Sequence, residues 1–387
     1  MTKPRILPTG AALPPDSAAA SPLQPILRRA IEDAGGWLSF DDFMALALYA
    51  PGHGYYASGS RKFGHMPQSG SDFVTAPELS PHFGRALARQ VGKALQATGT
   101  TEVWEFGAGS GALAERLIQS LDEAVESSTA LTRYTIVDLS SSLRERQQTR
   151  LAAYGDRVRW VQELPAQMTG VVVGNEVLDA MPVKLLARMG GVWHERGVAL
   201  HADEFVFADT PTELRPPLDI DGPQDYLTET HAQAEGFVRT LADRLTSGAI
   251  FLIDYGFPEH EYFHPQRNMG TLMCHRGHVA DSNPLKHVGL KDITAHVNFT
   301  GIALAGQDAG LHVLGYTSQG RFLLNCGVLD GMEDAPLEQR VMLQKLINEH
   351  EMGELFKVIG FASNTAQQPY NDWQALGFVH GDRSHTL

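Results

Sequence analysis

The middle of the chain alternates between short apolar runs and amphipathic stretches. Four apolar runs of strand length come first: 103–106, 134–137, 158–161 and 170–173. Segments 112–121 and 142–152 lie between the first three runs and predict helices, and a fifth run at 249–253 follows another helical pattern at 232–245. Because each crossover helix covers one face of a sheet, this alternation predicts an α/β fold with a parallel, doubly wound sheet.

The N-terminal quarter of the chain has a different pattern. Residues 1–25 are rich in Ala, Pro and Ser and have little periodicity, so we expect a flexible arm. Residues 26–98 contain helical patterns and, at 49–81, a long loop rich in glycine and aromatic residues. Long ordered loops tend to be functional. We therefore expect 26–98 to form a helical cap or lid on a main domain at 99–387.

The main domain is interrupted by two predicted insertions, at about 183–230 and 256–300. The first contains the alternating segments LLARM, VWHERGVAL and EFVFA, which predict an inserted antiparallel β-hairpin. The second is rich in glycine and histidine and only weakly periodic, so we expect an excursion over the edge of the sheet. Its residues His275, His278 and His287 lack the spacing and partners of metal ligands, and we predict no metal site.

The stretch VWEFGAGSGA joins the first predicted strand to its helix through a glycine-rich turn. Such a turn lets a ligand approach bare backbone, and the helix start presents free N–H groups. Gly107, Gly109 and Ala112 fit the dinucleotide pattern. Glu105 followed by Gly107, Gly109 and Gly111 fits the pattern of enzymes that bind S-adenosylmethionine (SAM). A carboxylate can hold a cationic amino acid group but repels a pyrophosphate, which favours SAM. A tight turn without a ligand is the third interpretation.

Polar residues also follow the second and third predicted strands. In open α/β sheets, ligands bind outside the carboxyl ends of the strands. Asp138, with Leu139 beside it, ends the second strand, where an acid can hold both ribose hydroxyls of an adenosine group. The alternative is a solvated acid at a helix start. Gln162 and Glu163 follow the third strand, either at the edge of an adenine ring or in an exposed loop.

The segment VVVGNEVLDAMP brings three polar side chains to the end of the fourth strand. Asn175 and Glu176 follow the apolar run directly, and Asp179 comes one turn later. Two carboxylates there suit a cationic acceptor such as a guanidinium group, which they bind through paired hydrogen bonds. The alternative is a helix N-terminus whose acids stabilise its dipole. Asp254 and Tyr255 end the fifth strand and are candidates for the wall of the same cleft.

Composition narrows the possible partners. The formal net charge is −14, so we expect no general attraction to nucleic acid or anionic lipid. No apolar run approaches the roughly 20 residues that a membrane helix needs, so we expect no membrane insertion. Only two cysteines occur, Cys274 and Cys326, which does not suggest a disulfide framework and fits a reducing compartment.

Several motifs, taken in this order, resemble the MidA-like family of SAM-dependent methyltransferases. They are YAPGHGYY, SDFVTAPELSPHFG, WEFGAGSGALA, VVVGNEVLDAMPVK, DYGF and LKDITAHVNF. The resemblance covers most of the chain from about Pro25. It implies a class I methyltransferase fold, Rossmann-like, with a seven-stranded, mostly parallel sheet, an N-terminal helical cap and insertions. The mitochondrial members of the family are protein arginine methyltransferases that assist the assembly of respiratory complex I.

The resemblance also implies roles for individual residues. Asn175, Glu176 and Asp179 match the family's NE-x-LDA run near the methyl acceptor. Asn298 stands where we would expect aspartate, which puts a catalytic role there in doubt. Asp138 stands where the family often has glutamate, and either acid can hold a ribose. The residues expected to bind or cover SAM are Glu105, Gly107, Gly109, Gly111, Asp138, Leu139, Gln162, Glu163, Thr75, Pro77 and Glu78.

The leading hypothesis is therefore an enzyme that transfers a methyl group from SAM to a nitrogen of a protein arginine. The implied partner is a protein substrate, with a subunit of respiratory complex I as the candidate. The implied location is the cytoplasm, or the mitochondrial matrix in a eukaryote. Two alternatives remain open: an assembly factor that binds SAM without turnover, and an NAD-dependent oxidoreductase that uses the same glycine turn.

Overall fold

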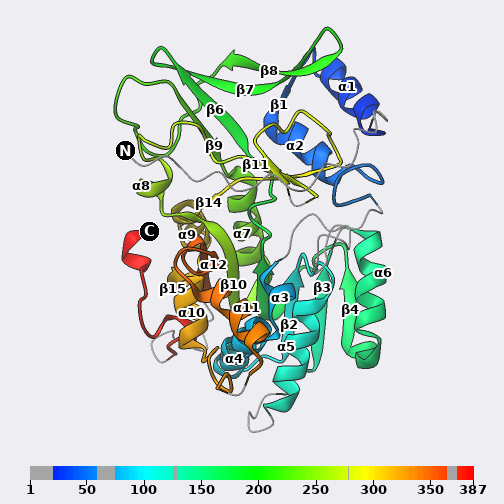
Figure 1. Cartoon of the computed structure of the whole chain (residues 1–387), viewed down its shortest axis with the longest axis vertical. Helices are drawn as coiled ribbons and strands as arrows, with labels where there is room; N and C mark the ends of the chain where they lie inside the picture. Colours follow the sequence, from blue (N-terminus) through cyan, green and yellow to red (C-terminus); the bar gives the residue numbers. More distant parts are fainter. Residues whose placement is uncertain are drawn as a thin grey trace.

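The described strands of the computed structural model form three sheets. A large sheet flanked by helices lies in the lower half of Figure 1, and two smaller antiparallel sheets lie above it, the larger of them with α1 and α2 beside it. The structure describes residues 21–58, 75–124, 130–138, 140–277, 279–333, 335–363 and 373–387.

The large sheet follows the strand order β15-β16-β10-β5-β2-β3-β4. Its strands pair in parallel except β16, which is antiparallel to both β10 and β15. The predicted α/β fold with a mostly parallel sheet of seven strands is therefore confirmed. The strands are β2 (Glu102–Phe106), β3 (Arg133–Val137), β4 (Val158–Val161), β5 (Met168–Asn175), β10 (Leu245–Phe257), β15 (His312–Ser318) and β16 (Phe356–Ala362). The two-residue strand β14 (Val297–Asn298) pairs in parallel with the end of β10.

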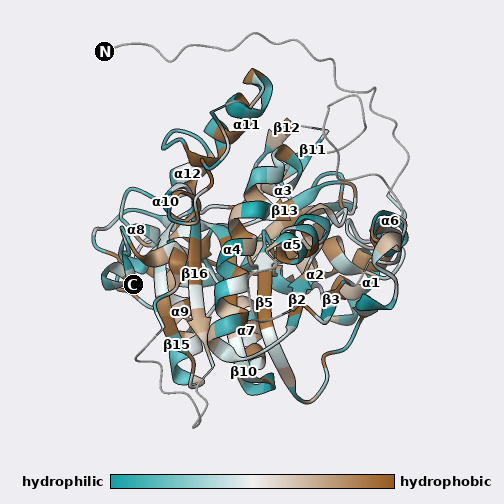
Figure 2. Ribbon diagram, turned by 90° about the horizontal axis from the view of Figure 1, so that it is seen from below, coloured by the Kyte–Doolittle hydropathy of each residue, from teal (hydrophilic) through white to brown (hydrophobic). Residues whose placement is uncertain are grey.

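Helices cover both faces of this sheet because successive residues of a strand point to opposite sides. Val171 and Val173 of β5 belong to the apolar cluster beneath α4 and α5, whereas Val172 belongs to the cluster with α7 and α9. Figure 2 shows β5 and β16 as largely hydrophobic, while α4 and α7 also carry hydrophilic residues. The helices are α4 (Pro81–Thr98), α5 (Ala112–Glu123), α6 (Ser141–Arg150), α7 (Ala232–Arg244), α9 (Phe299–Asp308), α10 (Gln319–Asn325) and α11 (Leu337–Ile347).

The larger upper sheet has the strand order β1-β7-β6-β9, with β8 paired to β7, and all its pairs are antiparallel. Helices α1 (Gln24–Asp33) and α2 (Phe40–Tyr49) share one apolar core with it. The first insertion thus contains a three-stranded meander, β6 to β8, and a return strand, β9. The strands are β1 (Trp37–Ser39), β6 (Lys184–Met189), β7 (Val192–His201), β8 (Glu204–Pro211) and β9 (Tyr226–Thr230).

The second insertion is more regular than its weak periodicity suggested. It contains a three-stranded antiparallel sheet in the order β12-β11-β13. Cys274 and Ile293 of this sheet belong to the same core as α1 and α2. These elements are β11 (Met273–Arg276), β12 (Val279–Asp281) and β13 (Asp292–Thr294), preceded by the short helix α8 (Glu259–Tyr262).

Helix α4 packs against α5, β5 and β10 of the large sheet. These contacts favour a domain division that places α4 with the large sheet, although the sequence grouped it with the cap at 26–98.

Over the described ranges, no helix is long and apolar enough to cross a membrane. The remaining short elements used below are α3 (Ala76–Leu79) and α12 (Met352–Leu355).

Candidate functional site

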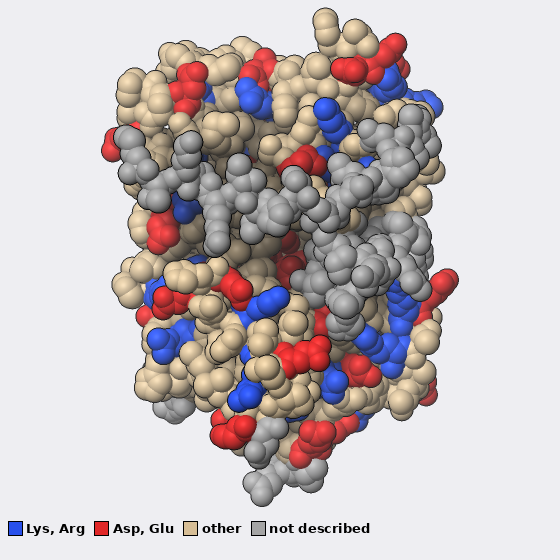
Figure 3. Space-filling model, viewed as in Figure 1, with Lys and Arg blue, Asp and Glu red and all other residues tan. Residues whose placement is uncertain are grey.

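A cavity of about 1400 Å³ lies at the carboxyl ends of the central strands, between the large sheet and the upper elements. Of the described residues that line it, none is lysine or arginine. Figure 3 shows a recess in the middle of this face with acidic atoms inside it. The acidic lining residues are Glu78, Glu105, Asp138, Glu163, Glu176, Asp179 and Asp292. A cavity with this lining is suited to a cationic ligand.

The glycine turn after β2 forms one side of the cavity. Gly107, Gly109 and Gly111 have φ angles of 63°, 53° and 82°, in the left-handed region that glycine adopts without strain. Gly107 N–H donates to the Val137 carbonyl (3.2 Å), which ties the turn to β3. Gly107 and Gly109 line the cavity. Gly111 lies behind them and is the N-cap residue of α5.

Glu105 is a buried acid at the end of β2, 2% exposed. Burial raises the pKa of its carboxyl to about 8, although a hydrogen bond from Tyr134 opposes this, and nearby Asp138 raises it further. The Tyr134 hydroxyl donates to Glu105 Oε2 at 2.7 Å. A cationic group bound in the cavity would favour the ionised carboxylate. Glu105 is thus placed to stabilise a ligand that carries an ammonium group.

A buried glutamine fixes Asp138 at the end of β3. Gln147 Nε2 donates both to Asp138 Oδ2 (2.7 Å) and to the Gly109 carbonyl (2.9 Å). Gln147 Oε1 accepts from the Trp160 indole (3.0 Å), and Ser140 N–H donates to Asp138 Oδ1 (2.8 Å). Sequence reasoning missed Gln147, because it lies in a polar helix without apolar periodicity. Its position nine residues after Asp138 carries no signal without the fold.

Three residues from the segment before α4 reach the same side. Thr75, Pro77 and Glu78 line the cavity. The Ser110 hydroxyl donates to Glu78, and Arg150 Nη1 donates to Ser110 Oγ at 2.6 Å. Arg150 Nη1 also lies 3.6 Å from Glu78 Oε1. These contacts join α3 to the glycine turn and to α6, and that the segment covers SAM remains a prediction.

The other residues expected near the cofactor divide into two groups. Gln162 and Glu163 follow β4 and line the cavity, although both are largely exposed. Leu139 and the part of the expected lid at 59–74 lie outside the described residues.

The end of β5, which pairs with β2, brings Asn175 and Glu176 to the cavity beside the glycine turn. Glu176 has φ +54°, an unusual backbone conformation for glutamate, and such conformations cluster at functional sites. Its N–H donates to the Ile253 carbonyl at 2.9 Å, and its Oε1 accepts from Asn175 Nδ2 at 3.0 Å. Burial raises the pKa of the Glu176 carboxyl to about 8, and the neighbouring Asp179 raises it further.

Asp254 has a structural role. It is fully buried, and its Oδ2 accepts from the N–H groups of Val177, Leu178 and Asp179 at 3.1, 2.9 and 3.2 Å. The carboxylate therefore fixes the turn that carries Asp179. The sequence proposed Asp254 and Tyr255 as cleft wall; Tyr255 lines the cavity, whereas Asp254 lies behind it and shapes it.

Two buried oxygen atoms on this side lack a hydrogen-bond partner: Asn175 Oδ1 and Asp179 Oδ1. Both residues line the cavity. Burial raises the pKa of Asp179 to about 6, against a hydrogen bond with the Tyr255 side chain. Unpaired buried acceptors are costly, so donors from a ligand would be favourable here.

The second insertion adds a carboxylate that sequence reasoning did not assign. Asp292 begins β13, lines the cavity and is 2% exposed. The Tyr56 hydroxyl donates to Asp292 Oδ2 (2.8 Å), and the Tyr49 hydroxyl donates to the Ala180 carbonyl (2.8 Å). The two tyrosine rings stack with centroids 5.6 Å apart. The sequence analysis identified the two motifs that contain these residues, YAPGHGYY and LKDITAHVNF. Nothing in the sequence indicated that they lie beside Glu176.

His296 and Asn298 follow β13. The His296 ring lines the cavity and packs between Tyr255 and Phe257, with centroids 5.2 and 5.3 Å away. Burial, with help from Arg267, lowers the pKa of His296 to about 4, so the ring is neutral near pH 7. Asn298 is the N-cap residue of α9, and its Oδ1 accepts from Gly301 N–H at 3.3 Å.

Strand order, glycine turn and acidic strand ends together define a SAM-dependent methyltransferase. The profile of a family of S-adenosyl-L-methionine-dependent methyltransferases matches residues 86–317, and the chain belongs to this family. A solved structure of a COG1565 superfamily member from Burkholderia thailandensis, bound to S-adenosyl-homocysteine, is 49% identical. The match covers 99% of this chain and 100% of that chain, with a TM-score of 0.89.

More distant relatives are named as protein arginine methyltransferases. The chain is 26% identical to the mitochondrial protein arginine methyltransferase NDUFAF7 homolog of Caenorhabditis elegans, over 76% of this chain and 74% of that protein. It is 24% identical to human mitochondrial protein arginine methyltransferase NDUFAF7, over 87% and 83%. The family and the Burkholderia structure show that the cofactor is SAM. The buried Glu105 carboxyl fits the ammonium group of SAM, and the fixed Asp138 fits its ribose. The glycine turn lets the cofactor approach the backbone.

Proposed function

We propose that this protein methylates a guanidinium nitrogen of an arginine side chain in a protein substrate. The observation that carries the proposal is a cluster of carboxylates beside the glycine turn, where the segment after β5 meets the start of β13. Glu176, Asp179 and Asp292 line the cavity, with no lysine or arginine among its described lining residues. A guanidinium group would supply both the missing positive charge and the hydrogen-bond donors.

On this proposal the cavity has two sides. On the first, Glu105 faces the amino acid part of SAM, and Asp138 holds the ribose. The glycine turn approaches the ligand there, and bound SAM supplies an electrophilic methyl group. Gln162 and Glu163 lie at the adenine edge, and Thr75, Pro77 and Glu78 cover the ligand.

On the second side, the carboxylates orient the acceptor. Glu176 and Asp179 hold the guanidinium by charge-assisted hydrogen bonds, Asn175 Oδ1 accepts a further one, and Asp292 completes the acidic wall. Methylation of a guanidinium that remains cationic releases one proton. Burial raises the pKa of the free Glu176 carboxyl to about 8, a bound guanidinium favours its ionised form, and the carboxylate can then accept that proton.

The mitochondrial relatives support arginine as the acceptor, since they are named as protein arginine methyltransferases. Their low identity makes the acceptor a proposal for this chain. The sequence motifs shared with the MidA-like family support a subunit of respiratory complex I as the candidate substrate protein.

The direct test uses SAM with an isotope-labelled methyl group. Purified complex I subunits and arginine-containing peptides serve as acceptors, and mass spectrometry after acid hydrolysis identifies the product. We expect labelled methylarginine. Label on another residue type would contradict the arginine acceptor. Tight SAM binding without any labelled product would instead support the alternative of an assembly factor that does not turn over.

A further inference from the structure

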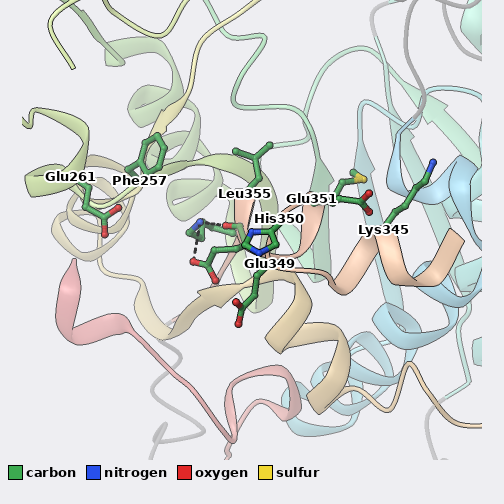
Figure 4. A pocket seen from close by; sticks show the side chains of 10 residues that line it. Phe257, Glu261, Lys345, Glu349, His350, Glu351 and Leu355 are labelled. Atoms are coloured by element: carbon green, nitrogen blue, oxygen red, sulfur yellow. Dashed lines mark hydrogen bonds and ion pairs between the residues drawn. The ribbon is translucent and has the colours of Figure 1, made fainter. Parts of the chain in front are cut away.

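A second cavity, of about 620 Å³, lies beside the acceptor side of the first. It is formed by the end of β10, by α8, by the segment from α11 to α12, and by the start of β16 (Figure 4). None of its residues was assigned a role by the sequence or by the proposed methyl transfer.

The two cavities share a wall. Met352 and Leu355 of α12 line both of them. The next residue, Phe356, packs edge-on against Tyr255 with ring centroids 5.4 Å apart, and Tyr255 hydrogen-bonds to Asp179. The second cavity therefore adjoins the side where the acceptor guanidinium is proposed to bind.

Part of the charge in the second cavity is compensated within the fold. Glu354 accepts from both terminal nitrogens of Arg383 (2.6 and 3.1 Å) and lies 3.5 Å from Lys357 Nζ. Lys357 is largely buried and also donates to the Glu354 carbonyl. These groups form a fixed wall of the cavity.

The remaining lining combines three exposed carboxylates, one exposed lysine (Lys345) and His350 with an apolar surface, so the carboxylates outnumber the lysine. Glu261, Glu349 and Glu351 are exposed and come from two different segments of the chain. Figure 4 shows Glu261 beside Phe257 at one end and Glu351 near Lys345 at the other. Leu355 is 46% exposed, although it is a large aliphatic residue. Such a surface can hold the aliphatic stem of a long basic side chain while carboxylates meet its charged end.

We propose that the second cavity binds the substrate polypeptide on one side of the acceptor arginine and selects segments with lysine or arginine near that acceptor. The inference rests on the proposed function, because it takes the occupant to be the arginine-bearing polypeptide. Because α12 lines both cavities, a polypeptide bound in the second cavity would lie next to the acceptor arginine. The exposed glutamates would favour lysine or arginine in that polypeptide.

Fluorescent peptides test this directly by anisotropy, without SAM and without turnover. One peptide carries a central arginine flanked by lysines, and the second carries the same arginine flanked by glutamates. The cavity variant is the double charge reversal Glu349→Lys and Glu351→Lys. The matched control is Glu204→Lys and Glu213→Lys, which changes the net charge equally at exposed positions outside both cavities.

We expect the wild-type protein to prefer the lysine-flanked peptide. The cavity variant should bind that peptide about tenfold more weakly, as expected for two lost surface ion pairs, and the control variant should not. SAM affinity and melting temperature should stay unchanged in both variants. Equal weakening in both double variants, or equal binding of the two peptides by the wild type, would overturn the subsite.

The labelled methyl-transfer assay, run on the same two peptides, separates this proposal from the proposed function. A preference for the lysine-flanked peptide without any methylarginine formed would support the subsite and contradict arginine methylation. Methylarginine formed with equal efficiency on both peptides, and no effect of the cavity variant, would contradict the subsite but support arginine methylation.

Discussion

Glu176 combines three features that each follow from where the chain places it. It adopts φ +54°, it is buried, and its pKa is raised to about 8. A residue that served only to cap a helix would gain nothing from burial in a left-handed conformation, which costs energy. The hydrogen bond from Glu176 N–H to Ile253 holds this conformation and aims the carboxyl at the cavity.

Replacement of this carboxyl tests the acceptor side. Glu176→Gln keeps the shape and removes the charge, so a lost charge-assisted hydrogen bond should lower kcat by about tenfold to hundredfold. Asp179→Asn should have a milder effect, and SAM affinity should hardly change in either. Labelled methyl transfer and calorimetry on one preparation measure both. Normal turnover by Glu176→Gln would remove this residue from the acceptor site.

Asp292 gives a second test at the residue scale. Asp292→Asn should lower kcat/KM for the acceptor by about tenfold or more, because a charged hydrogen bond is lost. Tyr56→Phe removes only the donor that fixes Asp292 Oδ2 and should have a smaller effect. Kinetics at varied acceptor concentration, with SAM saturating, resolve the two. An Asp292→Asn enzyme with unchanged acceptor kinetics would contradict a role in substrate binding.

At the scale of elements, the cofactor side depends on the contact between the glycine turn and α6. The side-chain amide of Gln147 in α6 donates hydrogen bonds both to the Gly109 carbonyl and to Asp138, which follow two different strands. One side chain thus sets the separation between the turn and the proposed ribose acid. The turn and the strand end act as one unit.

Substitution in the turn tests that unit. Gly109→Val places a branched side chain at φ +53° on the cavity surface and should abolish SAM binding. Gly310→Val is the control, because Gly310 also has positive φ (+91°) but has open space around it. The control should lose some stability and keep SAM affinity, both measurable by calorimetry. If both variants lost SAM affinity alike, general strain would explain the result.

At the scale of the whole molecule, the acidic cavity makes stability depend on pH. In the unfolded chain Glu105 and Glu176 ionise near their ordinary pKa of 4.5, but in the folded protein only near 8. The folded state therefore holds more protons over this range, and its stability from these groups is lost as the pH rises towards 8.

This gives a prediction for the free protein. Between about pH 6.5 and 8, above the range in which the lowered pKa of His296 adds stability, the melting temperature should fall, and Glu176→Gln should reduce that fall, since glutamine does not titrate. The stabilisation of Glu176→Gln over the wild type should therefore grow with pH. Thermal denaturation across this range measures it. A difference between the two proteins that does not change with pH would contradict the raised pKa of Glu176.

Local sequence patterns were enough to predict the local elements of this fold. The alternating apolar runs gave the parallel core of the large sheet, since strand and helix periodicities are local properties. Glu105, Asp138 and the NE-x-LDA segment could be proposed because strand ends in such a sheet share one edge. The glycine turn needed no tertiary information, as its conformation requires glycine at each position with positive φ.

Tertiary structure decided which distant segments meet. The short strand β1 pairs with β7 more than 150 residues later, a partnership that no local pattern encodes. Asp292 reaches the cavity only because β13 packs beneath α2, and Asp254 proved to support the site because its side chain turns towards the backbone of 177–179. Long-range packing fixes such contacts, and it also determines burial. Burial, in turn, raises the pKa values of the carboxyls at the centre of this cavity.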